Sequence, residues 1–196
     1  MTPFLESLRR ALEGRTVRPA VRHERTVEAA VALLLREAPD PEILLIHRAE
    51  LEGDPWSGHI ALPGGRRESG DRDLLATALR EAEEELGTAV AEVGKPLGAL
   101  PEIAPSSPRL PPIVIAPFVI AVPARLPLRP DPREVQSAFW VPIGALRDGD
   151  AATEVVLGGT GASRRFPGVR HGPHTIWGLT LGALHSLFDV LDEALP

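Results

Sequence analysis

Apolar residues follow two different spacings along the chain, and the change between them predicts where helices and strands lie. Phe4 to Leu12 has apolar positions three and four residues apart and is followed by Gly14, which predicts a short amphipathic helix. Val27 to Leu35 and Ile43 to Ile46 are nearly continuous apolar runs separated by the turn Pro39-Asp40-Pro41. This arrangement predicts a hairpin of two strands.

The clearest helical pattern in the chain lies further on. Apolar residues recur at helical spacing from Leu74 to Leu86, with Asp71 as the predicted N-cap and Gly87 as the glycine that ends the helix. The stretch Leu51 to Gly70 before it is rich in Gly and Pro and predicts a loop.

The rest of the chain alternates between apolar runs and breaks. We expect strands at Val90 to Leu100, Ile113 to Val122 and Val135 to Val141, a loop at Pro101 to Pro112, and helices at Pro142 to Leu146 and Ile176 to Leu195. Because strands and helices alternate without a regular βαβ spacing, the pattern favours an α+β fold with a mixed sheet. We divide the chain into an N-terminal helix with a basic link, residues 1–22, and one folded domain, residues 23–196.

Composition excludes several classes of protein. The 196 residues carry 21 Lys plus Arg against 27 Asp plus Glu, and this net charge of −6 argues against a general nucleic-acid-binding surface. There is no cysteine, which excludes disulfides, zinc fingers and thiol catalysis. No apolar run reaches about 18 residues and no signal peptide opens the chain, so we expect a cytoplasmic protein without a membrane span. The oligomeric state stays open, a homodimer included.

Three carboxylates share one face of the second predicted helix. At about 100° per residue, Glu81, Glu84 and Glu85 lie on one side, whereas Glu83 points away. Such carboxylates repel one another, and a hard divalent cation such as Mg²⁺ or Mn²⁺ would reverse the sign of that interaction. The alternative is a solvated acidic face that binds nothing. The upstream turn Pro63-Gly64-Gly65 favours the metal site, because glycines let the backbone approach a ligand and free carbonyl groups for a metal.

These residues resemble the signature of the Nudix hydrolase family. Its usual form is Gly, five residues, Glu, seven residues, then Arg-Glu-apolar-x-Glu-Glu-x-Gly, and the second half matches position by position from Arg80 to Gly87. In the first half, which begins at Gly65, Asp71 stands where Glu is usual, and eight residues separate it from Arg80. This spacing, which is one residue longer than usual, is similar to that of the coenzyme A-directed branch of the family. It leaves a ligand role for Asp71 unsupported.

Segments outside this signature resemble the same branch. Upstream, the run Leu44 to Ala49 and the later Gly58 are similar to it, although Ile46 replaces a usual Thr and Leu62 a usual Phe. Downstream, the similar segments are Ala116-Pro117-Phe118-Val119, Glu134-Val135, Phe139-Trp140-Val141-Pro142 and Ile176-Trp177-Gly178-Leu179-Thr180. The resemblance covers about residues 27 to 190 and implies the Nudix fold, a mixed β-sheet sandwiched between helices.

The resemblance also implies an activity. It implies a diphosphate hydrolase that cleaves the pyrophosphate of coenzyme A or an acyl-CoA to adenosine 3′,5′-bisphosphate and (acyl-)4′-phosphopantetheine. It assigns Mg²⁺ or Mn²⁺ to Glu81, Glu84 and Glu85, with the carbonyl of Gly65 as a further ligand. Two alternatives stay open, a pyrophosphatase for ADP-ribose or nucleoside-diphosphate sugars and a non-catalytic ligand sensor on the same fold. The complete set of glutamates argues against the sensor, because a sensor has no need of crowded carboxylates.

Three residues are candidates for catalysis beside the metal. Arg80 would hold the glutamates in position rather than touch the substrate. Glu84 would bind the metal or hold the attacking water. Glu134, just before a predicted strand, is the candidate general base, with an exposed residue of no catalytic role as the alternative.

Two arginines are candidates for phosphate binding. Arg48 follows a predicted strand and Arg67 follows the glycine pair, and for both the alternative is a surface salt bridge. His171 and His174 lie on a Pro-Gly loop without a third ligand, so we do not expect them to bind a metal.

Overall fold

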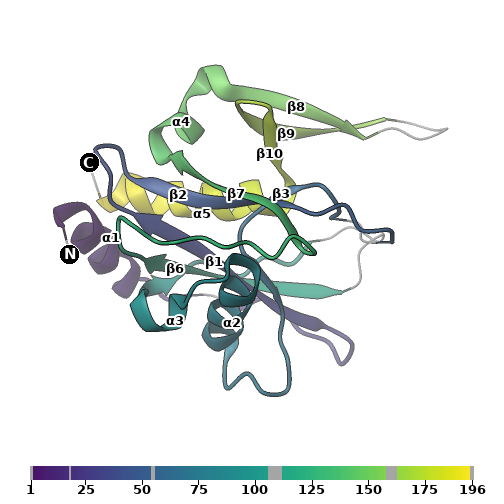
Figure 1. The fold of residues 1–196 in the computed structure, drawn as a ribbon, viewed down its shortest axis with the longest axis horizontal. Coiled ribbons are helices and arrows are strands. Elements are labelled where there is room, and N and C mark those ends of the chain that lie inside the picture. The colour runs from purple at the N-terminus through teal and green to yellow at the C-terminus, as the bar shows by residue number, and fades with distance from the viewer. Residues whose placement is uncertain (1, 18, 54–55, 106–111, 158–162, 195–196) are drawn as a thin grey trace.

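A computed structural model describes residues 2–17, 19–53, 56–105, 112–157 and 163–194 (Figure 1). The helices are α1 (Pro3–Glu13), α2 (Leu74–Leu86), α3 (Val90–Val93), α4 (Ile143–Arg147), α5 (Gly178–Ala194) and the 3-10 turn η1 (Gly149–Ala151). The strands are β1 (Val27–Arg36), β2 (Glu42–Arg48), β3 (Ile60–Ala61), β4 (Gly64–Arg66), β5 (Lys95–Ala99), β6 (Ile113–Ala121), β7 (Val135–Pro142), β8 (Ala152–Leu157), β9 (Arg164–His171) and β10 (His174–Trp177).

A mixed sheet of seven strands forms the centre of the molecule. Its order is β3-β2-β1-β6-β5, with β4 also paired to β1 and β7 to β2. Strands β1 and β6 run parallel, from Val27 opposite Ile113 to Leu35 opposite Ala121, and the other pairs are antiparallel. The predicted hairpin of β1 and β2 is confirmed, and so is the mixed sheet of an α+β fold.

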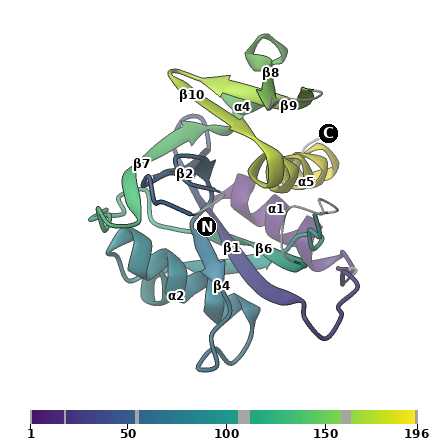
Figure 2. The ribbon, with the colours of Figure 1, turned by 90° about the vertical axis from the view of Figure 1, so that its right-hand side faces the viewer.

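Helices cover both faces of this sheet. Helix α2 lies on one face, and α1 and α5 pack side by side on the other (Figure 2). Alternate residues of β1 therefore enter two separate apolar layers, one formed with α2 around Ala30, Ala32 and Leu34, the other formed with α1 and α5 around Leu33 and Leu35. A strand buried on both faces reads as a continuous apolar run, which explains the sequence of β1.

The N-terminal helix belongs to the same core. Its predicted apolar side buries Leu5, Leu8 and Leu12 against α5 and β5, and Pro3 occupies its first turn. Pro is suited to that place because it has no backbone N–H group, and an N–H group in the first turn would have no partner within the helix.

Two predicted elements begin later than expected, since each is preceded by a short element of the other type. Residues 90–100 are not one strand, because helix α3 comes first and Gly94 ends it by donating its N–H to the Val90 carbonyl at 2.8 Å. The C-terminal helix begins at Gly178 rather than Ile176, since Ile176 pairs with Val169 of β9 and belongs to β10. Side-chain spacing alone did not separate these short elements from their neighbours.

The predicted loop from Leu51 to Gly70 contains the short strands β3 and β4. Both form only by pairing with β2 and β1, so no local apolar pattern marks them. Residues 106–111 of the predicted loop Pro101 to Pro112, and Leu195 of the predicted C-terminal helix, lie outside the described residues.

A second, three-stranded antiparallel sheet was not expected from the sequence. Its order is β10-β9-β8, and it extends away from the main sheet (Figure 1). Strand β8 is largely exposed and β9 is rich in Arg, Gly and Pro, so neither shows a core-facing pattern. Among the described helices, none is long and apolar enough to cross a bilayer.

Candidate active site

Helix α2 carries the acidic residues, and its start differs from the prediction. Asp73, not Asp71, is the N-cap, because an oxygen of its side chain accepts the N–H of Ala76 at 2.8 Å. The helix ends as predicted at Gly87, whose φ of 58° lies in the left-handed region that glycine adopts without strain.

Asp71 instead anchors an arginine of the helix. Its two carboxylate oxygens accept hydrogen bonds from Nε and Nη2 of Arg80, both at 3.0 Å. The N–H of Glu68 and the hydroxyl of Thr77 donate to the same carboxylate, at 2.9 and 3.0 Å. The Arg80 hydrogen bonds, followed by the Glu68 bond, hold the pKa of Asp71 well below its usual range. Asp71 is therefore a charged anchor in this fold, not a helix cap.

Arg80 connects this anchor to two of the three glutamates. Its Nη2 lies 3.0 Å from an oxygen of Glu81, and its Nη1 donates to Glu84 at 3.0 Å. Nη2 also donates to the backbone carbonyl of Arg66 at 3.0 Å. Arg80 is therefore held between the Asp71 carboxylate and two glutamates of α2.

Glu85 is the most deeply buried of the glutamates, with 2% of its side chain exposed. One oxygen accepts the N–H of Gly64 at 2.9 Å, and the other lies 3.6 Å from Nη1 of Arg48. Burial raises its pKa to about 8, and the charges of Glu81 and Glu134 act in the same direction. Burial therefore favours the protonated form of Glu85 in the protein without a cation.

Glu81 lies against the glycine turn. Burial, and then the charges of Glu84 and Glu134, raise its pKa against the opposing effect of Arg80. A Cβ atom at Gly65 would overlap the Glu81 carboxylate, so the close approach of the backbone to this carboxylate requires glycine.

Glu134 comes from a distant part of the sequence. Its backbone carbonyl accepts the N–H of Ala49, just after β2, at 2.8 Å, and its side chain is exposed. Its charge raises the pKa of both Glu81 and Glu85, so Glu134 lies within electrostatic range of the two glutamates.

The remaining acidic residues of α2 differ as the helical geometry predicts. The side chain of Glu84 is 58% exposed on the side of Glu81. Glu83 points away and accepts the N–H of Ala91 in α3 at 2.8 Å. Its position agrees with the prediction that Glu83 does not face the site.

Arg67 does not lie among the glutamates. Its Nη1 donates to Glu28 at 2.9 Å, and its Nη2 donates to the carbonyls of Asp71 and Arg72 at 3.3 and 3.4 Å. Arg48, by contrast, reaches the glutamates through Glu85. Of the two arginines proposed for phosphate, only Arg48 contacts a described carboxylate of α2.

The donor set can be tested against a divalent cation. Within the described residues, no three His, Asp or Glu side chains already surround one point as ligands would. Arg80 forms ion pairs with Glu81 and Glu84. The available donors are hard oxygens, and the charge of Glu81 raises the pKa of Glu85, as a nearby carboxylate does. Such a set fits Mg²⁺ or Mn²⁺ if the exposed side chain of Glu84 exchanges its ion pair with Arg80 for the cation.

Histidines gather at a second place, where β10 meets the main sheet. The ring of His174 stacks on Phe139 with centroids 4.6 Å apart and lies 5.5 Å from the ring of His47. The sequence offered no sign that His47 would approach His174. These rings pack as neighbours and do not form a ligand set among the described residues.

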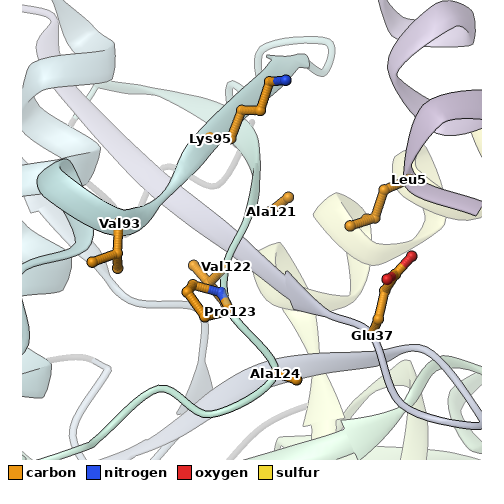
Figure 3. Close-up of a pocket in the computed structure, with 8 residues that line it drawn as sticks. All are labelled: Leu5, Glu37, Val93, Lys95, Ala121, Val122, Pro123 and Ala124. Carbon is orange, nitrogen blue, oxygen red and sulfur yellow. The ribbon is translucent and has the colours of Figure 1, made fainter. Parts of the chain in front are cut away.

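A shallow hollow at the other end of β1 is separate from this site. Figure 3 shows it between α1, α3 and the end of β6, with Glu37 and Lys95 on opposite sides of an apolar floor. It is lined by Leu5, Glu37, Val93, Lys95, Ala121, Val122, Pro123 and Ala124, none of which is a predicted site residue.

Comparison with known proteins gives one consistent family. A family model described as "NUDIX domain" matches residues 25–157. A Nudix hydrolase called NudL from Photorhabdus laumondii is 34% identical over 81% of this chain and 82% of its own length. NudL from Salmonella heidelberg is 30% identical over 87% of both chains. A longer Schizosaccharomyces pombe protein is 35% identical over 64% of this chain, which spans 39% of that protein.

Solved structures agree on the fold. The Nudix hydrolase RenU from M. smegmatis has a TM-score of 0.58 with 21% identity and 88% coverage of both chains. A MutT/nudix family protein from Enterococcus faecalis has a TM-score of 0.57 with 18% identity, covering 89% of this chain and 66% of that one.

Proposed function

This chain belongs to the Nudix family of diphosphate hydrolases, and from that membership we propose that it cleaves the pyrophosphate of coenzyme A or an acyl-CoA. The products would be adenosine 3′,5′-bisphosphate and 4′-phosphopantetheine, acylated or not. Support for this substrate comes from the segment Leu44 to Ala49 and the one-residue expansion between Asp71 and Arg80, which resemble the coenzyme A-directed branch.

The proposed metal ligands are Glu81, Glu84, Glu85 and the carbonyl of Gly65. The observation that carries this proposal is that both glutamates lie against the glycine turn, since Glu85 accepts the N–H of Gly64 and the Glu81 carboxylate occupies the space of a Cβ atom at Gly65. When bound, Mg²⁺ or Mn²⁺ would neutralise the pyrophosphate and lower the pKa of a coordinated water. A protein of charge −6 needs such neutralisation to accept a polyanionic substrate.

Four residues of the chain have proposed roles beside the metal ligands. Arg48, which lies beside Glu85, would bind a phosphate oxygen when the substrate enters. Glu134 would accept the proton of the attacking water, since its exposed carboxylate lies outside the helix and within electrostatic range of Glu81 and Glu85. Arg80, fixed by Asp71, would keep Glu81 and Glu84 in the required orientation. In this scheme Arg67 binds the turn before α2 and not the substrate.

A substrate panel tests the proposal. Purified protein with Mg²⁺ or Mn²⁺ is incubated with coenzyme A, acetyl-CoA, ADP-ribose and a nucleoside-diphosphate sugar, and the products are identified by mass spectrometry. Release of adenosine 3′,5′-bisphosphate, at a rate well above that for ADP-ribose, is the expected result. Preferred cleavage of ADP-ribose would assign the alternative pyrophosphatase activity, and tight binding without cleavage of any compound would assign the ligand sensor.

A further inference from the structure

A continuous series of hydrogen-bonded ion pairs links the segment before β1 to the turn that begins α2. It starts at Arg22, just upstream of residue 25, where the family match begins. Nε of Arg22 donates to Glu28 at 2.7 Å, and Nη1 and Nη2 donate to the two oxygens of Glu102 at 2.9 and 2.7 Å. The N–H of Ala20 also donates to Glu102, at 2.7 Å. The segment is thereby fixed both to β1 and to the residues that follow β5.

Glu28 extends the series to the turn. Its second oxygen accepts Nη1 of Arg67 at 2.9 Å, and its backbone carbonyl accepts the N–H of Arg67 at 2.9 Å. Arg67 in turn binds the carbonyls of Asp71 and Arg72. The Asp71 carboxylate in turn binds Arg80. The contacts therefore connect Arg22 to Arg80, the arginine that binds the glutamates.

The series is partly shielded from water. Glu102 is 10% exposed, Glu28 is 28% exposed and Arg22 is 31% exposed. Hydrogen bonds from Arg22 are the largest cause lowering the pKa of both Glu28 and Glu102. Charge-assisted bonds in a shielded network hold their geometry better than isolated surface pairs do.

We propose that Arg22 is a positioning residue for the metal site. By fixing Glu28, and through it Arg67, it holds the turn between Gly65 and Asp71 in the geometry that presents Gly65 and the Arg80-bound glutamates to a divalent cation. This inference rests on the metal ligands proposed above but not on the identity of the substrate.

The test measures metal binding without substrate. Arg22→Gln keeps a polar side chain and removes the charged guanidinium that binds Glu28 and Glu102. The dissociation constant for Mn²⁺ is measured by electron paramagnetic resonance of the free ion. We expect the substitution to raise it about threefold to tenfold, at or below the usual effect of residues that orient metal ligands. Hydrogen exchange of the Arg67 amide is accelerated, saturating Mn²⁺ restores kcat, and Arg22→Lys restores part of the affinity.

Arg15→Gln is the matched control. Arg15 lies in the same N-terminal segment, is 32% exposed, and pairs with Glu193 of α5 at 3.1 Å instead of with the turn. It is expected to leave Mn²⁺ affinity and Arg67 exchange unchanged. Equal effects of the two variants, or an unchanged Mn²⁺ affinity in Arg22→Gln, would overturn the inference. Wild-type protein that binds Mn²⁺ without cleaving coenzyme A would contradict only the proposed substrate, whereas wild-type protein that binds no Mn²⁺ would overturn both the metal site and this inference.

Discussion

The backbone of Gly65 lies directly against the carboxylate of Glu81, with no room for a side chain between them. Gly65 and Glu81 belong to different elements, the short strand β4 and the helix α2, and the contact joins the two halves of the Nudix signature. The neighbouring Gly64 is constrained differently, since an added Cβ there would overlap the backbone of Ala30 and its φ is +152°. We therefore expect alanine substitutions at Gly64 and Gly65 to have different effects on stability and activity.

Gly65→Ala is expected to lower activity by about tenfold or more while the melting temperature changes little, because only the end of a flexible glutamate must move. Gly64→Ala is expected to cost more than about 1 kcal/mol of stability, because the obstruction is backbone and the φ angle suits glycine. Thermal unfolding and steady-state kinetics of both variants check this. If Gly65→Ala unfolds as readily as Gly64→Ala, the contact with Glu81 is structural and not functional.

Glu85→Gln is expected to reduce kcat by about a hundredfold or more, because it removes a charged ligand for the cation. The fold should be retained, since glutamine resembles the protonated acid and still accepts the N–H of Gly64. Glu83→Gln is the control, because its amide oxygen can still accept the N–H of Ala91 and it faces away from the site. Activity lost equally in both variants would contradict the geometric assignment.

Glu134→Gln is expected to lower kcat by roughly 10²- to 10⁴-fold with little change in KM, as removal of a general base does. Glutamine keeps the size and hydrogen-bonding capacity of the side chain, and the carbonyl contact to Ala49 is unaffected. Rates at pH 7 and pH 9 are compared with wild type. A kcat within about threefold at both values would reject Glu134 as the base and return the role to Glu84.

Asp71→Asn is expected to weaken metal affinity or activity by about tenfold to a hundredfold, because the neutral amide holds Arg80 less firmly. Asp73→Asn, two residues away, changes the helix cap to another good capping residue and should be nearly silent. Metal titrations of the two variants provide the comparison. Similar losses in both would show that the helix start, and not the anchoring of Arg80, is what matters.

Acid is expected to destabilise the contact between β10 and the main sheet. Burial, and then the charges of His47 and His171, lower the pKa of His174 below its ordinary value of 6.5. At a pH between the folded pKa and the unfolded pKa of His174, the unfolded chain binds more protons than the folded chain. The contribution of His174 to the free energy of unfolding is therefore complete above pH 6.5 and is lost as the pH falls through the folded pKa. Urea unfolding at pH 7.5 and 5.5 should show a smaller difference for His174→Gln than for wild type. The exposed His23 supplies the control, and a His23→Gln variant that changes the pH dependence equally would contradict the assignment.

Local sequence was sufficient for helix α2 and the orientation of its carboxylates. Along one helix, spacing alone decides which side chains share a face, so the opposite directions of Glu85 and Glu83 followed from the residues themselves. The burial of Glu85 did not follow from the spacing, because it depends on what packs against the helix. The same reasoning identified the buried strand β1, because its apolar run is continuous. The position of Asp71 could not be assigned in this way. Cap and anchor roles both suit an aspartate before a helix, and only the place of Arg80 distinguished them.

Tertiary structure decided everything that depends on pairing between distant segments. Glu134 lies within electrostatic range of Glu85 because β7 pairs with β2, and Arg67 binds Glu28 because β4 pairs with β1. The sheet of β8, β9 and β10 also depends on such pairing, since its strands show little apolar pattern of their own. A helix satisfies its backbone hydrogen bonds within one segment, whereas a strand takes its partners from elsewhere in the chain. The sequence by itself therefore determined the acidic helix and the family signature, and the paired strands determined which other residues stand around it.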